Sequence, residues 1–103
     1  MDQEGPDLNF AASGALADDR VIVTVTGEVD MSTADAMFLT ATQDNAVRAT
    51  IDLRAVTFFD SAAIHALLRL AEHYGDDFDV LPSAQVRRVL EISGLATQPW
   101  LKD

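Results

Sequence analysis

The junction at residues 57–64 constrains the fold of this chain more than any other segment. An apolar strand is expected from Ile51 to Phe59, and it ends at an acid, Asp60. A hydroxyl residue, Ser61, follows at once and begins a helix-forming run. A strand that turns directly into a helix is typical of a layered α/β fold. The junction also places the Ser61 hydroxyl at the exposed start of that helix, where it can be modified without disturbing a core.

The rest of the chain alternates between strand and helix patterns in the same way. The expected strands cover residues 8–12, 20–26 (ended by Gly27), 47–53 (extended through Val56 after a turn around 52–54) and 78–81. The expected helices begin at Ser32 (with Asp35 as a capping partner), at Ser61 (ending near Tyr74, capped by Gly75) and at Pro82–Ser83 (stopped by Gly94). Trp100 and Leu101 are expected to fold back onto the body. This order predicts an α/β fold with a small mixed β-sheet of about four to five strands, covered by three or more α-helices.

Length and charge limit the classes of function. The 103 residues fit one domain, residues 1–103, in which residues 1–7 are expected to be disordered. The formal net charge of −10 repels phosphate backbones and anionic lipid, so it disfavours nucleic-acid and membrane-surface binding. Such acidity favours a partner with a basic patch, or serves solubility alone.

Several kinds of site and location are disfavoured by what the sequence lacks. Without cysteine, a disulfide, a zinc–thiolate site or a cysteine nucleophile is excluded. No apolar run approaches the roughly 20 residues that span a bilayer, and the acidic N-terminus does not resemble a signal peptide. We therefore expect a cytoplasmic protein without direct membrane insertion.

Catalysis is also disfavoured by the motifs. There is no phosphate-binding glycine loop and no Gly-x-Ser-x-Gly elbow. His65 and His73 are eight positions apart on one helix, too far to share a metal ion. His65 lies one helical turn after Ser61, but no third catalytic member or oxyanion hole accompanies this pair. The sequence predicts a protein that is not an enzyme and needs no cofactor.

Acidic residues follow two of the expected strands. Glu28 and Asp30 come after the strand that reaches Gly27, and Asp60 follows the strand before Ser61. Acids at the ends of neighbouring strands converge at one end of a sheet. Asp30 and Asp60 are therefore interpreted as caps of the helices that follow, as part of a divalent-metal site that still lacks ligands, or, for Asp30, as part of the surface around Ser61.

Three blocks in order resemble a known family. The first is 25–30 followed by Thr33–Ala34, the second is 51–53 with 56–61, and the third is 89–95. Together, over residues 8–95, they resemble the STAS domain, and within it the bacterial anti-sigma factor antagonists.

This resemblance implies a phosphorylation switch. Members of the family bind a serine kinase that is also an anti-sigma factor, and thereby release the sigma factor. Phosphorylation of the serine after the aspartate abolishes the binding, and a serine phosphatase restores it. Ser61 occupies the phosphorylated position, and Asp30 matches the family's nearby acid. The implied partner-binding residues are Asp30, Thr33, Asp60, Ser61, Ala62, Ala63 and His65.

The chain departs from the family pattern directly after Ser61. Ala62 and Ala63 replace a hydroxyl residue and a glycine, and His65 replaces a small residue, so Ser61 is the only acceptor there. These changes alter a helix face expected to lie close to a partner. They leave open a non-phosphorylated STAS interaction or scaffold module of a stress-signalling complex or a membrane transporter. A small-ligand sensor is a third alternative, although the sequence offers no phosphate cradle.

Overall fold

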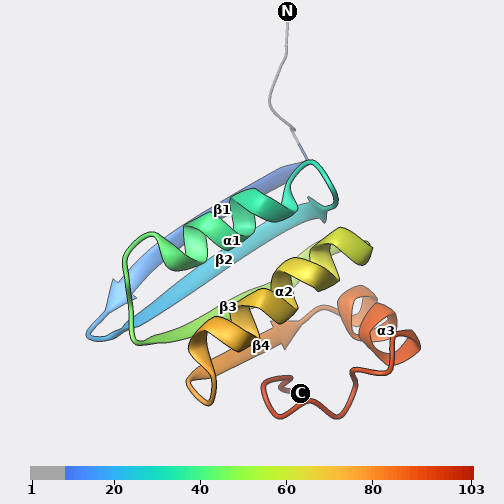
Figure 1. Cartoon of the computed structure of the whole chain (residues 1–103). Coiled ribbons are helices and arrows are strands. Elements are labelled where there is room, and N and C mark those ends of the chain that lie inside the picture. Colours follow the sequence, from blue (N-terminus) through green and yellow to red (C-terminus); the bar gives the residue numbers. More distant parts are fainter. Residues whose placement is uncertain (1–8) are drawn as a thin grey trace, which may run out of the picture.

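The structure is a computed structural model that describes residues 9–103 and shows a four-stranded mixed sheet with three helices (Figure 1). The strands are Phe10–Ala17 (β1), Arg20–Val29 (β2), Arg48–Phe59 (β3) and Phe78–Pro82 (β4). The helices are Ala34–Thr42 (α1), Ser61–Tyr74 (α2) and Ala84–Ile92 (α3). The strands lie in the order β1-β2-β3-β4; β1 pairs antiparallel with β2, and the other two pairs are parallel. The predicted α/β fold with a mixed sheet is confirmed.

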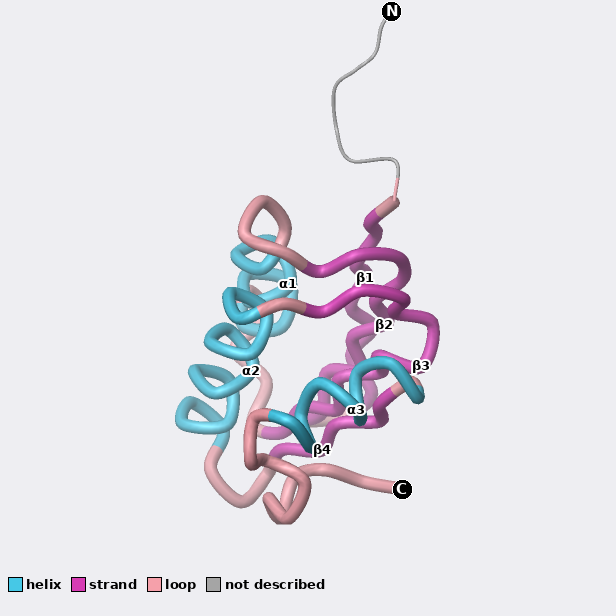
Figure 2. The backbone as a smooth tube through the Cα atoms, turned by 90° about the vertical axis from the view of Figure 1, so that its right-hand side faces the viewer, coloured by secondary structure: helices cyan, strands magenta, loops and turns pink. Residues whose placement is uncertain are grey.

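Helices α1 and α2 lie beside each other on one face of the sheet (Figure 2). The core forms between them and the inward-facing side chains of the central strands, including Val23 of β2 and Ile51 of β3, which are fully buried. Alternate residues of β2 point to the other face, where Ile22 and Thr24 are exposed. The nearly continuous β-branched run at 20–26 predicts a strand buried on both faces, but the structure buries it on one face only.

Two strand predictions differ from the structure in their extent. Gly27 does not end β2, and the strand continues to Val29. The backbone at Gly27 has a φ of +88°, which glycine adopts without the steric cost that other residues would have. The expected turn around 52–54 does not break β3. The Asp52 carboxylate accepts the Arg54 amide at 3.1 Å, and a shift in the β2–β3 register absorbs the irregularity.

The first strand and two helix starts also differ from expectation. Strand β1 runs to Ala17 instead of ending at residue 12, while residue 8 and the expectation for residues 1–7 lie outside the described residues. Helix α1 begins at Ala34, and Thr33 is its N-cap without a side-chain capping bond, so a Ser32–Asp35 capping box does not form. Pro82 ends β4, and Ser83 caps α3 by accepting the Val86 amide at 3.1 Å.

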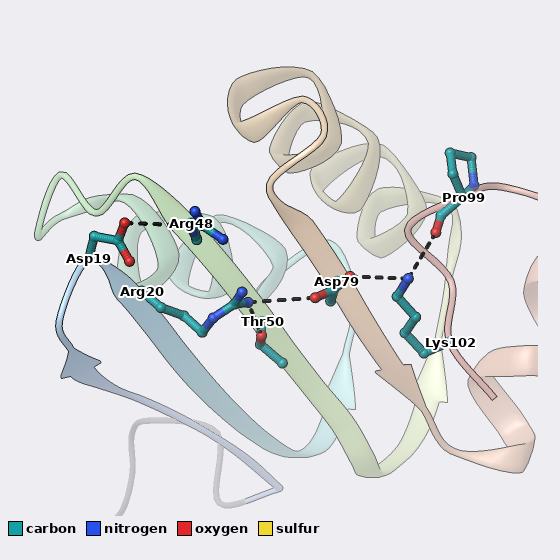
Figure 3. A network of polar contacts seen from close by, with 7 residues as sticks. All are labelled: Asp19, Arg20, Arg48, Thr50, Asp79, Pro99 and Lys102. Carbon is teal, nitrogen blue, oxygen red and sulfur yellow. Dashed lines mark hydrogen bonds and ion pairs between the residues drawn. The ribbon is translucent and has the colours of Figure 1, made fainter.

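The C-terminal segment closes the outer edge of β4. The Val80 amide donates to the Trp100 carbonyl at 2.8 Å, and the Lys102 amide donates to the Val80 carbonyl at 2.9 Å. Trp100 is buried against Phe78, which confirms that this segment folds back. The Asp79 carboxylate lies between two cations, at 3.5 Å from the Arg20 guanidinium and 3.3 Å from the Lys102 ammonium group (Figure 3). This ion-pair network links β2, β4 and the C-terminal segment.

Candidate functional site

The ends of β2 and β3 meet at one edge of the sheet because these strands are parallel. Val29 pairs with Phe59, so Asp30 and Asp60 follow the last paired residues of the two strands. The Asp60 amide also donates to the Val29 carbonyl at 3.3 Å. The predicted convergence of acidic residues at this end of the sheet is therefore confirmed.

Asp60 fixes the start of α2. Its carboxylate accepts the Ala63 amide at 3.0 Å, and its carbonyl accepts the Ile64 amide at 3.0 Å. The carboxylate bond satisfies one of the amides that a helix N-terminus leaves without an intrahelical partner, and the carbonyl bond is the first of the helix's own ladder. The predicted capping role of Asp60 is confirmed. Ser61 is the first residue of the helix and is exposed, as the sequence predicts.

Asp30 organises the loop between β2 and α1. Its carboxylate accepts the Ser32 hydroxyl at 2.7 Å and the Ser32 amide at 2.9 Å. These hydrogen bonds favour the ionised form and lower the pKa of Asp30 below its ordinary value. The predicted side-chain capping of α1 by Asp30 is wrong, because this carboxylate binds Ser32 and only the Asp30 carbonyl accepts the Ala34 amide, at 2.8 Å.

Two of the implied partner-binding residues are buried. The Thr33 hydroxyl donates to the Glu28 carbonyl at 3.0 Å and accepts the Asp30 amide at 2.9 Å, so it holds the loop from beneath. Ala63 is fully buried, and its side chain packs into the core instead of facing a partner. The sequence could not separate Ala63 from its exposed neighbours because alanine fits both environments.

Two shallow hollows flank the start of α2, and Met31 lines both. The first, of about 340 Å³, is lined by Asp30, Met31, Ser32, Phe58 and Asp60. The second, of about 240 Å³, lies between α1 and α2 and is lined by Met31, Ala34, Asp35, Ala62, His65, Ala66 and Arg69. We call the exposed and half-exposed residues Asp30, Met31, Phe58, Ser61, Ala62 and His65 the Ser61 surface.

Sequence reasoning missed Met31 and Phe58. Met31 is 84% exposed and Phe58 is 45% exposed, although both are large apolar side chains. Strand alternation offered a signal for Phe58: when Phe59 faces the core, its neighbour must face away. Exposed apolar side chains beside polar groups are typical of protein–protein contact sites.

The two hollows beside Ser61 differ in the side chains that line them, which include carboxylates in the first and an imidazole and a guanidinium in the second. Asp30 and Asp60 line the first hollow, and His65 and Arg69 line the second. The Ser61 hydroxyl has no hydrogen-bond partner among the described residues.

Across residues 9–103, no three His, Asp or Glu side chains gather closely enough to hold a metal ion, and no helix is long and apolar enough to cross a membrane.

Comparison with known families agrees with this architecture. A family model described as "Mlab, STAS domain" matches residues 13–102. The chain belongs to the STAS domain family. None of the curated proteins compared with it matches.

Solved structures of anti-sigma factor antagonists resemble this fold over 89–91% of the chain. An anti-sigma factor antagonist from Mycobacterium paratuberculosis is 28% identical, with a TM-score of 0.76 over 89% of this chain and 84% of that one. The unphosphorylated anti-sigma factor antagonist SpoIIAA is 22% identical, with a TM-score of 0.71 over 90% and 87% of the two chains. The phosphorylated form of the Bacillus cell fate determinant SpoIIAA is 24% identical, with a TM-score of 0.65 over 91% and 89%. This STAS domain thus resembles anti-sigma factor antagonists at 22–28% identity.

Proposed function

We propose that this STAS domain is an anti-sigma factor antagonist whose Ser61 surface binds an anti-sigma factor with serine kinase activity. Binding of the antagonist releases the sigma factor, and phosphorylation of Ser61 ends the binding. The observation that carries this proposal is the position of Ser61. Its hydroxyl is exposed at the first residue of α2, on a helix start held in place by Asp60.

The surroundings of Ser61 suit a protein partner. Met31 and Phe58 offer exposed apolar area on the Ser61 surface, and the two hollows beside them can receive partner side chains. The hydroxyl lies among these features, so a kinase that docks there can reach it. The chain acts in this scheme as a binding protein and a kinase substrate, not as an enzyme.

A phosphate on Ser61 opposes this contact electrostatically. It adds about −1.5 to −2 charges at neutral pH. One new charge about 6 Å from a partner carboxylate costs roughly 3 kcal/mol at an effective dielectric constant near 20. This energy corresponds to about a hundredfold loss of affinity. A bulky group on a surface that previously packed against a partner adds to the loss.

The same phosphate leaves the fold intact. The positive end of the α2 dipole faces the added charge and stabilises it by about 0.3–1 kcal/mol. Ser61 does not contribute to the core, so the modification displaces no packed side chain. The likeness of this fold to the phosphorylated form of SpoIIAA supports the view that a STAS fold accommodates such a group. An exposed phosphate is also open to removal by a serine phosphatase.

The test uses a serine kinase of the anti-sigma type, ATP and intact-mass measurement. The expected result is a gain of one phosphate that is absent in Ser61→Ala and retained in Ser93→Ala, a matched variant that removes an exposed hydroxyl at the end of α3, outside the Ser61 surface. Ser61→Asp is expected to bind the unmodified protein's partner about a hundredfold more weakly.

Another outcome would favour a second function. Stable binding of such a kinase without any phosphate transfer would refute the switch and indicate the scaffold module. The exposed His65, which lines the hollow beside Ser61 where the family has a small residue, is the observation that favours this alternative.

A further inference from the structure

The two edge strands of the sheet differ in whether another segment hydrogen-bonds to their outer side. The outer edge of β4 is closed by the hydrogen bonds of Val80 with Trp100 and Lys102. The outer edge of β1 carries no such cover, because no segment within residues 9–103 pairs with it. A strand edge without a partner presents a row of free backbone donors and acceptors.

Strand β1 also lacks the features that keep edges from pairing. Its sequence, Phe-Ala-Ala-Ser-Gly-Ala-Leu-Ala, contains no charged residue and no proline. Its register with β2 runs without a bulge from Phe10 to Ala17. Natural edge strands are usually short or interrupted by lysine, proline or a bulge, so an eight-residue regular edge is suited to pairing.

The outward-facing backbone groups can be assigned from the pairing with β2. The Glu28 amide donates to the Asn9 carbonyl, so this position of the first strand faces β2. The direction alternates along an antiparallel ladder. The amides and carbonyls of Phe10, Ala12, Gly14 and Leu16 therefore point away from β2, toward the open edge.

We propose that β1 pairs antiparallel with β1 of a second copy of this chain, which joins the two sheets into one. A two-fold axis perpendicular to the sheet places Ser13 opposite the second copy's Ser13. Phe10 then lies opposite Leu16, and Ala12 opposite Gly14, in both directions. These are the positions whose backbone groups point outward, so the register also forms the hydrogen bonds of a regular ladder.

A second copy fits this edge chemically. Each copy carries a net charge of −10, so association is tolerated only where the contact brings no carboxylates together. None of the eight residues of β1 is charged, so no like charges face each other in this register. Leu16 is 55% exposed, and pairing covers it with the second copy's Phe10 on the face that the helices occupy. The interface is self-complementary, as a two-fold contact requires.

The test measures mass in solution by sedimentation equilibrium up to about 1 mM protein in about 0.15 M salt. The Debye length of about 8 Å at this salt concentration screens the distant charges of the two copies but leaves directly opposed charges interacting. The wild type is expected to shift from 11.1 kDa toward twice that mass. Ser13→Asp and Ser13→Lys each place like charges opposite each other across the axis. Each is expected to weaken the dimer on the order of tenfold or more. An equimolar mixture of the two variants is expected to restore association as a heterodimer.

Thr24→Lys is the matched control. Thr24 pairs with Ser13 on the same exposed face, but it lies one strand further from the edge, so the dimer is expected to persist. Melting temperatures close to the wild type show that each variant is folded. A wild type that stays monomeric at 1 mM, or a mixture of the two Ser13 variants that fails to associate, would overturn the proposal. Equal disruption by Thr24→Lys would do the same, because it would point to the sheet face instead of the edge.

Discussion

Replacement of Ser61 by aspartate tests whether a negative charge at the start of α2 leaves folding unaffected. Ser61 is exposed, and its hydroxyl has no hydrogen-bond partner among residues 9–103, so the substitution removes no contact. The new carboxylate gains about 0.3–1 kcal/mol from the helix dipole. It loses a similar amount by repulsion from the neighbouring Asp60, roughly 0.7 kcal/mol at about 6 Å in water. The free energy of unfolding therefore changes by less than about 1 kcal/mol.

Thermal unfolding followed by circular dichroism measures this change. For a domain of this size, 1 kcal/mol corresponds to a Tm shift of about 4–8 °C, so Ser61→Asp is expected to stay within that range of the wild type. Ala63→Asp is the control. It adds the same charge to the same turn of α2, but at a fully buried position. An unpaired buried carboxylate costs several kcal/mol, so this variant is expected to melt far lower or not to fold. A drop in Tm for Ser61→Asp as large as that for Ala63→Asp would refute the reasoning.

Three further predictions concern the residues that hold the site. Asp60→Ala removes the cap on the Ala63 amide and is expected to lower the free energy of unfolding by about 1 kcal/mol in urea titrations, whereas Asp60→Asn, which keeps an acceptor oxygen, is expected to lose less. Gly27→Ala places a Cβ 1.6 Å from the Asn9 carbonyl oxygen at a φ of +88°, so a Tm at least about 8 °C lower is expected, and an unchanged Tm would contradict this close approach. The pKa of Asp30 is lowered in the folded state by Ser32, so its stabilising contribution is present above the unfolded pKa and is lost as pH falls through the folded pKa. Asp30→Asn is therefore expected to flatten the dependence of Tm on pH in the acidic range, and an unaltered pH profile would count against the Asp30–Ser32 contact.

Helix α2 was predictable because several local signals agree. Asp60 supplies an N-cap, Gly75 follows the last turn, and the residues between have strong helical character. Even there, the helical spacing of Ile64, Leu67, Leu68 and Ala71 predicts the buried stripe only in part. Leu68 is 39% exposed, whereas Ala63 and Leu70 are fully buried. Hydrophobicity alone does not show how a helix is rotated on its sheet.

The length of β1 was not predictable from local preference. Alanine, serine and glycine are poor strand formers, and these residues dominate the strand after Phe10. They are extended because they pair with β2, whose sequence strongly favours a strand. Their small side chains also leave room for neighbouring elements to lie close to β1. A Cβ on Gly14 would lie 3.3 Å from a methyl group of Val21, so this position has little room for a larger residue.

The Asp30 loop shows a second limit of sequence reasoning. Asp30, Ser32 and Thr33 are all good capping residues, and their order alone does not determine which of them caps α1. In the structure, Thr33 turns its hydroxyl back to the Glu28 carbonyl, and Asp30 binds Ser32. The distinction depends on how the end of β2 is held against β3, which is a tertiary effect.

The direction of β1 has a consequence for valency. Phe10 pairs with Gly27, so β1 begins at the same end of the sheet as Ser61. In the proposed antiparallel dimer, the two Ser61 surfaces consequently lie at opposite ends and face away from each other. A bivalent partner with both its binding sites on one side therefore cannot bind the two Ser61 surfaces of one dimer at the same time. Mixing the two would crosslink them into chains, with light scattering greatest near equal stoichiometry, instead of forming a closed complex with enhanced avidity.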